Sequence, residues 1–369
     1  MMKIYTPGHP SILETYIMYG IISALSRNLM PDEQKQIRVS AKGLFYEIEY
    51  SEELQIDCSS LYDSVLKAYN SVRDVEKFQG VGLLGPLGFQ NEEKVIEFVS
   101  QAATVKDISE VYSLVPRESS ERESPCKLHE RRLRTAQIPI APMLGKYYSK
   151  HEASGVSIPK AMQYKICPLC LLFALEGLLK YSTIFQVLSE RSTSWIYSQL
   201  KPSITCGADE LNYLLIQNRL SKKAVARRAK FMNEIPEIVV PLLVFYVADS
   251  HVAMELSKLE PEFISYRLEV AGKAPAIRSY NTYNVKPLLE FISTIKSTNP
   301  EFESTIDALR INIDRCIDAL TFLSISALVR DIDKFYNFLR LCSTYYGQKI
   351  KVRIPSEEEI HTAIKWFYK

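Results

Sequence analysis

The amino-acid sequence predicts an α+β protein, in which an irregular α/β domain is followed by a C-terminal helical bundle. Three observations support this fold class. Glycine supplies 13 of the 369 residues, which is about half its usual share and disfavours turn-dense all-β folds. Alternating apolar and polar residues between positions 37 and 50 indicate a β-hairpin. Apolar residues at helical spacing recur through most of the chain after Pro236.

The N-terminal domain is expected to start with a helix and then a hairpin. Ser11 and Glu14 form a capping-box signature, and apolar residues from Leu13 to Leu25 follow at helical spacing. A hairpin with one mostly apolar face is predicted within residues 37–50. Three amphipathic helices are expected next, at residues 61–69, 91–102 and 105–115.

The middle of the chain differs in composition. Residues 116–165 hold five prolines, a densely charged first half and no sustained periodicity. A loop of this length inside a domain is usually functional, held by a ligand, or mobile. After it, an apolar helix is predicted over residues 169–188, and a second, less buried helix over residues 208–231.

The C-terminal third is predicted to be a helical bundle. We place a domain boundary near residue 235, which gives an α/β domain at 1–235 and a bundle at 236–369. Residues 264–285 are richer in strand formers and are expected to form a hairpin or an extended arm. Ser356 is expected to cap a final helix that ends at Lys369. The other helices are expected at residues 239–256, 287–295, 304–323 and 328–341.

Cysteine and histidine are spaced as metal ligands in two places. Cys126 and His129 form one pair, and Cys167 and Cys170 form another, each with two intervening residues. This spacing lets both side chains of a knuckle reach one ion, and two knuckles complete a tetrahedron. The pairs bracket the irregular 116–170 stretch, where an ion would close a loop that lacks a hydrophobic core. The sequence therefore predicts a zinc-knuckle-like insertion with a structural Zn²⁺, because four protein ligands leave no open position for catalysis.

Other interpretations of these residues stay open at this point. The cysteines could be ordinary buried residues beside an apolar helix, with an incidental histidine in a polar loop. His151 competes as the fourth ligand, and Cys206 is a weaker candidate. A thioredoxin-like role for Cys167 and Cys170 has less support, because redox pairs begin a helix with their first cysteine, whereas here the second cysteine leads into the helix.

Positive charge is clustered although the formal net charge is only +2. Residues 211–233 contain no acidic residue but six basic ones. On a helix, four of these would form one continuous stripe, namely Arg219, Lys223, Arg227 and Lys230. Such a stripe can contact phosphates, so we interpret it as a nucleic-acid surface. A solvated face balanced by acids elsewhere is the alternative. The basic residues concerned are Arg219, Lys222, Lys223, Arg227, Arg228 and Lys230.

Two further regions are candidates for nucleic-acid contact. Arg131, Arg132 and Arg134 directly follow the first knuckle, so a bound metal would fix their position. In residues 264–285, basic and aromatic side chains alternate, and the aromatic rings could stack on unpaired bases. Tyrosines are equally expected in cores and protein interfaces. The residues in this region are Tyr266, Lys273, Arg278, Tyr280 and Tyr283.

Local patterns exclude several enzyme classes. Residues 80–85 match the dinucleotide-binding pattern G-x-G-x-x-G, but a charged, helix-like stretch precedes them and no helix start follows, so we reject that site. The chain contains no phosphate-binding P-loop and no H-E-x-x-H motif. Asp249, Ser250 and His251 are adjacent, and neighbours on a helix point in different directions, which disfavours a triad. We therefore expect a binding protein and not an enzyme.

The sequence carries no signal for export or membrane insertion. Seven cysteines are an odd number in a long chain, which disfavours a secreted disulfide framework. The apolar runs at residues 169–179 and 238–248 are shorter than the ~20 residues that a membrane helix needs. The first 25 residues lack a cleavage-site pattern. We expect a cytoplasmic protein without membrane contact.

Three features together resemble the large subunit of archaeal type I-A CRISPR interference (Cascade) complexes. They are the opening Tyr5-Thr6-Pro7-Gly8-His9-Pro10 before a helix, the Cys167-Pro168-Leu169-Cys170 sequence leading into an apolar helix, and the all-helical C-terminal third. The resemblance concerns layout over most of the chain. It implies an antiviral defence protein with an irregular α/β N-terminal part and a C-terminal helical bundle.

The resemblance also implies partners and a function. Such subunits lie at the 5′ end of the guide RNA, engage the short motif that flanks the DNA target, help to open the duplex and help to recruit the helicase–nuclease. By analogy, the glycine-rich loop at residues 80–88, with Gln90 and Asn91 beyond it, is a candidate probe of the DNA groove. In such complexes base pairing reads most of the sequence, while protein reads the flanking motif and backbone. A stand-alone metal-dependent nuclease and a DNA-binding regulator are the rival hypotheses.

Overall fold

The computed structural model describes residues 1–9, 11–27, 37–76, 92–116, 126, 129, 133, 136–138, 164–188, 193–202, 205–207, 210, 212–214, 216–217, 230–231, 235–271, 274–298, 302–348 and 352–368. The chain forms two compact units. The first comprises residues 1–182, 205–209 and 268–278, and the second comprises residues 183–204, 210–267 and 279–369. The expected boundary near residue 235 lies inside the second unit. The division into two independently folding domains, 1–235 and 236–369, stays a prediction.

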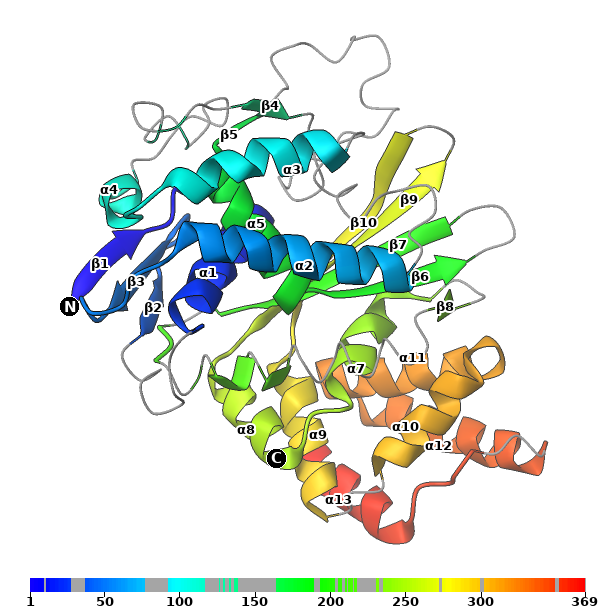
Figure 1. The fold of residues 1–369 in the computed structure, drawn as a ribbon. Coiled ribbons are helices and arrows are strands. Elements are labelled where there is room, and N and C mark those ends of the chain that lie inside the picture. Colours follow the sequence, from blue (N-terminus) through cyan, green and yellow to red (C-terminus); the bar gives the residue numbers. More distant parts are fainter. Residues whose placement is uncertain are drawn as a thin grey trace, which may run out of the picture. The chain divides into compact units, whose positions relative to one another are not determined.

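A three-stranded antiparallel sheet belongs to the first unit (Figure 1). Its strand order is β1 (Met2–Tyr5), β3 (Tyr46–Tyr50) and β2 (Arg38–Ala41). Tyr46 and Ile48 are buried and Glu47 between them is less so, which is the alternation that predicted the hairpin. The β2–β3 hairpin is therefore confirmed. The sequence did not indicate β1, because four residues are too few to establish a period.

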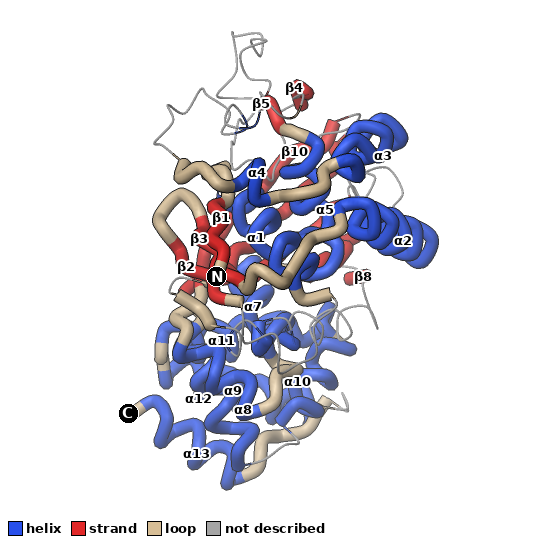
Figure 2. Tube along the Cα trace, turned by 60° about the vertical axis from the view of Figure 1, so that its left-hand side comes forward, coloured by secondary structure: helices blue, strands red, loops and turns tan. Residues whose placement is uncertain are grey.

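Helix α5 (Pro168–Tyr181) is the central element of the first unit, and nearly all of its residues are buried. It packs against α1 (Ser11–Leu25), α2 (Cys58–Glu76) and α3 (Glu92–Ser100) (Figures 1 and 2), and also against the 3₁₀ helix η3 (Gln101–Thr104). These helices were predicted. The helix expected at residues 105–115 is shorter, because α4 spans only Ser109–Tyr112.

Helices α1 and α5 cross at two glycines. A Cβ atom added to Gly20 would overlap the carbonyl oxygen of Phe173, and one added to Gly177 would overlap the carbonyl oxygen of Tyr16. Only glycine lets the two backbones approach this closely. A buried carboxylate lies beside the crossing, where Glu176 accepts hydrogen bonds from Ser23 Oγ, Arg27 Nη2 and Lys180 Nζ at 2.6, 3.1 and 2.5 Å. The crossing thus combines close backbone contact with a paired internal charge.

Most of a five-stranded sheet in the described residues belongs to the second unit, while residues 268–278 of its β9–β10 hairpin are assigned to the first. Its strand order is β10 (Ala274–Asn284), β9 (Glu262–Ala271), β7 (Thr193–Lys201), β6 (Thr183–Leu188) and β8 (Lys230–Phe231). Strand β6 pairs antiparallel with β7 and parallel with β8. The hairpin expected at residues 264–285 is confirmed as β9 and β10. Tyr197 of β7 stacks on Tyr266 of β9, with ring centroids 5.1 Å apart.

Two helix predictions before residue 235 are wrong in part. The helix expected over residues 169–188 ends at Tyr181, and Ser182 is extended. The remaining residues form β6 because β-branched and aromatic side chains favour strands. In the helix expected over residues 208–231, described residues between 210 and 217 are helical. Lys230 and Phe231 instead form β8, where Lys230 pairs with Gln186, so Lys230 does not continue a helical stripe.

The helices after Pro236 confirm the helical character of the C-terminal region, with more breaks than predicted. Asp249 caps α8 and separates it from α7, and Asn312 separates α10 from α11. Ser356 and Glu359 form the capping box of the last helix, as expected. Within the described ranges, no helix is long and apolar enough to cross a bilayer. The elements are η7 (Glu237–Val239), α7 (Val240–Phe245), α8 (Ser250–Lys258), α9 (Lys286–Thr298), α10 (Phe302–Ile311), α11 (Ile313–Val329), α12 (Ile332–Gly347) and α13 (Glu357–Phe367).

The helix crossing predicts the effect of adding one methyl group. Gly20→Ala and Gly177→Ala should each lower the free energy of unfolding by about 1–3 kcal/mol, because the new Cβ forces two buried backbones apart. Urea and thermal unfolding followed by far-UV circular dichroism would measure the change.

Gly347→Ala is the matched control, because no atom lies within 4 Å of a Cβ added to this helical glycine. It should leave stability unchanged or raise it by up to about 1 kcal/mol. If Gly20→Ala and Gly177→Ala were as stable as Gly347→Ala, the close crossing would be refuted.

Candidate metal centre

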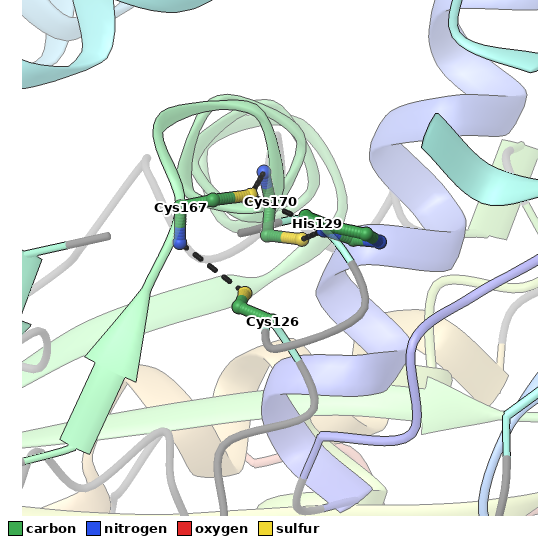
Figure 3. A group of neighbouring side chains, drawn as sticks. All are labelled: Cys126, His129, Cys167 and Cys170. Atoms are coloured by element: carbon green, nitrogen blue, oxygen red, sulfur yellow. Dashed lines mark hydrogen bonds between the residues drawn. The ribbon is translucent and has the colours of Figure 1, made fainter. Parts of the chain in front are cut away.

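The structure brings Cys126, His129, Cys167 and Cys170 together in the interior of the first unit (Figure 3). All four side chains are buried, and their candidate ligand atoms lie within 4.8 Å of one another. Three thiols and one imidazole converge on one point. The cluster can therefore hold a metal ion.

Local structure explains why two distant segments meet here. Strands β4 (Ala136–Ile138) and β5 (Tyr164–Ile166) pair antiparallel, with Ala136 opposite Ile166. This pairing places the residues before β4 beside those after β5. Cys167 then caps the N-terminus of α5, and its sulfur accepts a hydrogen bond from the backbone N–H of Cys170. The helix thus begins with the first cysteine, and the expectation that the second cysteine leads into it is wrong. A helix N-terminus favours a negatively charged ligand such as a thiolate.

The distances within the cluster suit a tetrahedral ion. His129 Nδ1 lies 3.4 Å from Cys167 Sγ and 3.5 Å from Cys170 Sγ. Zinc–nitrogen bonds of about 2.0 Å and zinc–sulfur bonds of about 2.3 Å at a tetrahedral angle require a nitrogen–sulfur separation of about 3.5 Å. The two nitrogen–sulfur separations thus match the edges of such a tetrahedron.

The pKa values of the thiols are unequal. Burial disfavours the Cys167 thiolate, but hydrogen bonds from Cys126, Cys170 and His129 outweigh burial and hold the pKa of Cys167 well below its ordinary value. Burial raises the pKa of Cys126 and of Cys170 well above the ordinary value. One sulfur is therefore ready to bind a cation, and ligation to a metal would ionise the other two.

Sequence reasoning missed two residues that contact the cluster. His9 Nε2 lies 3.4 Å from Cys126 Sγ, and Tyr112 Oη lies 3.3 Å from Cys170 Sγ. Burial lowers the pKa of His9 to about 3, so its ring is neutral. The ring of Tyr112 also meets His129 edge-on, with centroids 5.0 Å apart. His9 stands in the opening hexapeptide that carried the family resemblance, but no ligand spacing links it to the knuckles.

Glu14, which was expected to form a capping box with Ser11, instead accepts hydrogen bonds from residues upstream of Ser11. The Glu14 carboxylate accepts the backbone N–H groups of Gly8 and His9 at 2.8 and 2.7 Å, which lie upstream of Ser11. Gly8 has a φ of +84°, which turns the chain so that both N–H groups face the carboxylate. Burial raises the pKa of Glu14 to about 7, and the hydrogen bonds from the chain oppose that rise. Glu14 thereby fixes the backbone of His9 beside the cluster.

The other predicted site residues are placed as follows. Cys206 is buried in a β-bridge with Val39 and is not a member of the cluster. Tyr266 is buried in its stack with Tyr197, so it is not available to stack on a base. Tyr280 is exposed on β10. Outside the described residues lie His151, Gln90, Asn91, Arg131, Arg132, Arg134, Arg219, Lys222, Lys223, Arg227, Arg228, Lys273 and the glycine-rich loop at 80–88.

Comparisons with known proteins cover most of the chain. Residues 2–356 match the family described as CRISPR-associated protein (Cas_Csa4). The chain is also 24% identical over 312 residues to the CRISPR-associated protein Cas8a2/Csa4 of Methanocaldococcus jannaschii. That similarity spans 83% of this chain and 79% of the relative.

The geometry of the cluster predicts the metal content of the protein. Purified chain should contain about one transition-metal ion per molecule, and Cys167→Ser should lose it, because a neutral hydroxyl is a far poorer ligand than a thiolate. Plasma mass spectrometry across the first-row metals would measure both proteins.

Cys342→Ser serves as the matched control, since Cys342 is an equally buried cysteine in the second unit. It should retain the full metal content of the wild type. A folded wild-type protein without metal would contradict the prediction.

Proposed function

Because this chain belongs to the Csa4 family of CRISPR-associated proteins, we propose that it is the non-catalytic large subunit of a type I-A interference complex and binds target DNA there. The match over residues 2–356 carries the proposal, since it covers most of both compact units. In this role the protein engages the motif that flanks the target, helps to open the duplex and helps to recruit the helicase–nuclease. Its partners are the guide RNA, the DNA and the other subunits, in the cytoplasm.

The metal in this proposal is a structural Zn²⁺. Three thiolates and one imidazole in tetrahedral arrangement are a donor set that zinc prefers. Cys126, His129, Cys167 and Cys170 would fill all four positions, so no site is left for a substrate or a reactive water. The ion would join the segment around residue 126 to the start of α5, between which the sequence shows no sustained periodicity. Zinc here supports the fold and takes no part in cleavage.

DNA contact is assigned to the basic residues in the acid-free segment 211–233. Lys230 belongs to strand β8, so the proposed contact residues centre on Arg219, Lys223 and Arg227 and their basic neighbours. Clustered Lys and Arg side chains bind the phosphate backbone with little sequence preference. This suits a subunit of a complex in which guide RNA reads the target by base pairing.

A cleavage assay separates this proposal from its rivals. The purified protein should bind labelled duplex DNA and labelled single-stranded DNA. It should cleave neither, with or without Mg²⁺ or Mn²⁺. Affinity should fall steeply with salt, because each phosphate contact releases counterions. Metal-dependent cleavage would favour the nuclease, and tight binding of one sequence alone would favour a regulator.

Charge reversal tests the proposed contact residues. Lys223→Glu combined with Arg227→Glu should weaken DNA binding and reduce the slope of log Kd against log salt by about 2, one for each phosphate that is no longer neutralised. Fluorescence anisotropy with labelled DNA at several salt concentrations would measure the slope.

Lys67→Glu with Lys106→Glu is the control, because both lysines are exposed and the net charge changes equally. This control should keep the slope of the wild type. Equal behaviour of the two double variants would remove the 211–233 segment from the proposed interface.

A further inference from the structure

Each sulfur of the candidate centre lies within hydrogen-bond distance of a donor. The backbone N–H of Cys167 donates to Cys126 Sγ at 3.2 Å, and the backbone N–H of Cys170 donates to Cys167 Sγ at 3.4 Å. Two side chains outside the ligand set complete the pattern. His9 Nε2 contacts Cys126 Sγ at 3.4 Å, and Tyr112 Oη contacts Cys170 Sγ at 3.3 Å. A thiolate can only accept, so His9 and Tyr112 are the donors once the sulfurs are ligated.

A metal-loaded centre needs these donors for an electrostatic reason. Three thiolates, one neutral imidazole and Zn²⁺ carry a net charge of −1, and all four ligands are buried. A buried charge is costly unless hydrogen bonds compensate it. The two backbone donors belong to the segment that starts α5. The other two donors to the buried thiolates are the side chains of His9 and Tyr112, which lie far from the knuckles in the sequence. His9, for example, is 117 positions from Cys126.

We propose that His9 and Tyr112 are positioning residues that stabilise the metal-bound thiolates of Cys126 and Cys170 through hydrogen bonds from outside the ligand set. This inference rests on the proposed zinc centre and adds to it. Residues that hold metal ligands in this way typically contribute 10–100-fold to metal affinity.

His9 is assigned as a donor and not as a ligand because of its position. The ligand atoms that lie mutually within 4.8 Å belong to Cys126, His129, Cys167 and Cys170. His9 meets this group from the side of Cys126. Its backbone is held by the Glu14 carboxylate at 2.7 Å. The ring nitrogen Nε2 lies 3.4 Å from one sulfur of the cluster, that of Cys126.

Tyr112 supports Cys170 from another element. It lies at the end of α4, is buried, and directs its hydroxyl at the sulfur while its ring packs edge-on against His129 and near Phe173. Burial raises the pKa of Tyr112 well above its ordinary value, so the hydroxyl keeps its proton. Removal of this hydroxyl leaves the ring contacts in place, which makes Tyr112→Phe a mild test.

The test measures zinc affinity by competition with a chromophoric chelator and records the absorption spectrum of the Co²⁺-substituted protein. Tyr112→Phe and His9→Phe should each weaken zinc binding by about 10-fold or more. Both should keep the intense d–d bands of tetrahedral Co²⁺ and shift the thiolate-to-cobalt charge-transfer band. His9→Gln, which retains an N–H donor, should lose less affinity than His9→Phe.

Tyr16→Phe is the matched control, because it removes a buried tyrosine hydroxyl that hydrogen-bonds to Ser182. It should bind zinc as the wild type does. Wild-type affinity in both Tyr112→Phe and His9→Phe would overturn the inference, as would loss of the tetrahedral cobalt spectrum in His9→Phe, which would make His9 a ligand. If His9→Phe fails to fold, Tyr112→Phe decides. A wild type that binds neither Zn²⁺ nor Co²⁺ would instead refute the zinc centre itself.

Discussion

The first unit depends on the close contact of two helix backbones at Gly20 and Gly177. Helix α1 begins just after His9, and α5 begins just after Cys167. Their crossing therefore sets the distance between the opening hexapeptide and the start of α5. A larger side chain at either glycine would separate the helices and, with them, the two ends that meet at the cysteine–histidine cluster. Packing of two helices thus determines the geometry of the site.

Metal ligation would complement this packing because the two act on different parts of the chain. Helices α1 and α5 are held by buried apolar surface and by the paired carboxylate of Glu176. Cys126 and His129 stand in a stretch of sequence without sustained apolar periodicity. A coordinated ion would hold such a stretch in place, because it joins distant residues at a few strong bonds.

Sequence patterns predicted the elements with a clear period and the ligand pairs with a fixed spacing. The β2–β3 hairpin, the core helices and the Ser356 capping box followed from local signals. The sequence predicts helix where β6 forms, because these residues continue the apolar run of α5. The pairing of β6 with β7 depends on tertiary contacts that no local pattern contains. The four clustered ligands were found because two knuckles are local features. His9 and Tyr112 were missed because their contacts depend on how α1, α4 and α5 pack together.

The distances in sequence between the groups that meet at the cluster also constrain its assembly. His9 and Cys126 are 117 positions apart, and Cys126 and Cys167 are a further 41 apart. During synthesis from the N-terminus, the ligand set stays incomplete until Cys170 has left the ribosome. Until then, the contact between the Cys126–His129 segment and the start of α5 cannot form. Contacts of such long sequence range form late and slowly in folding.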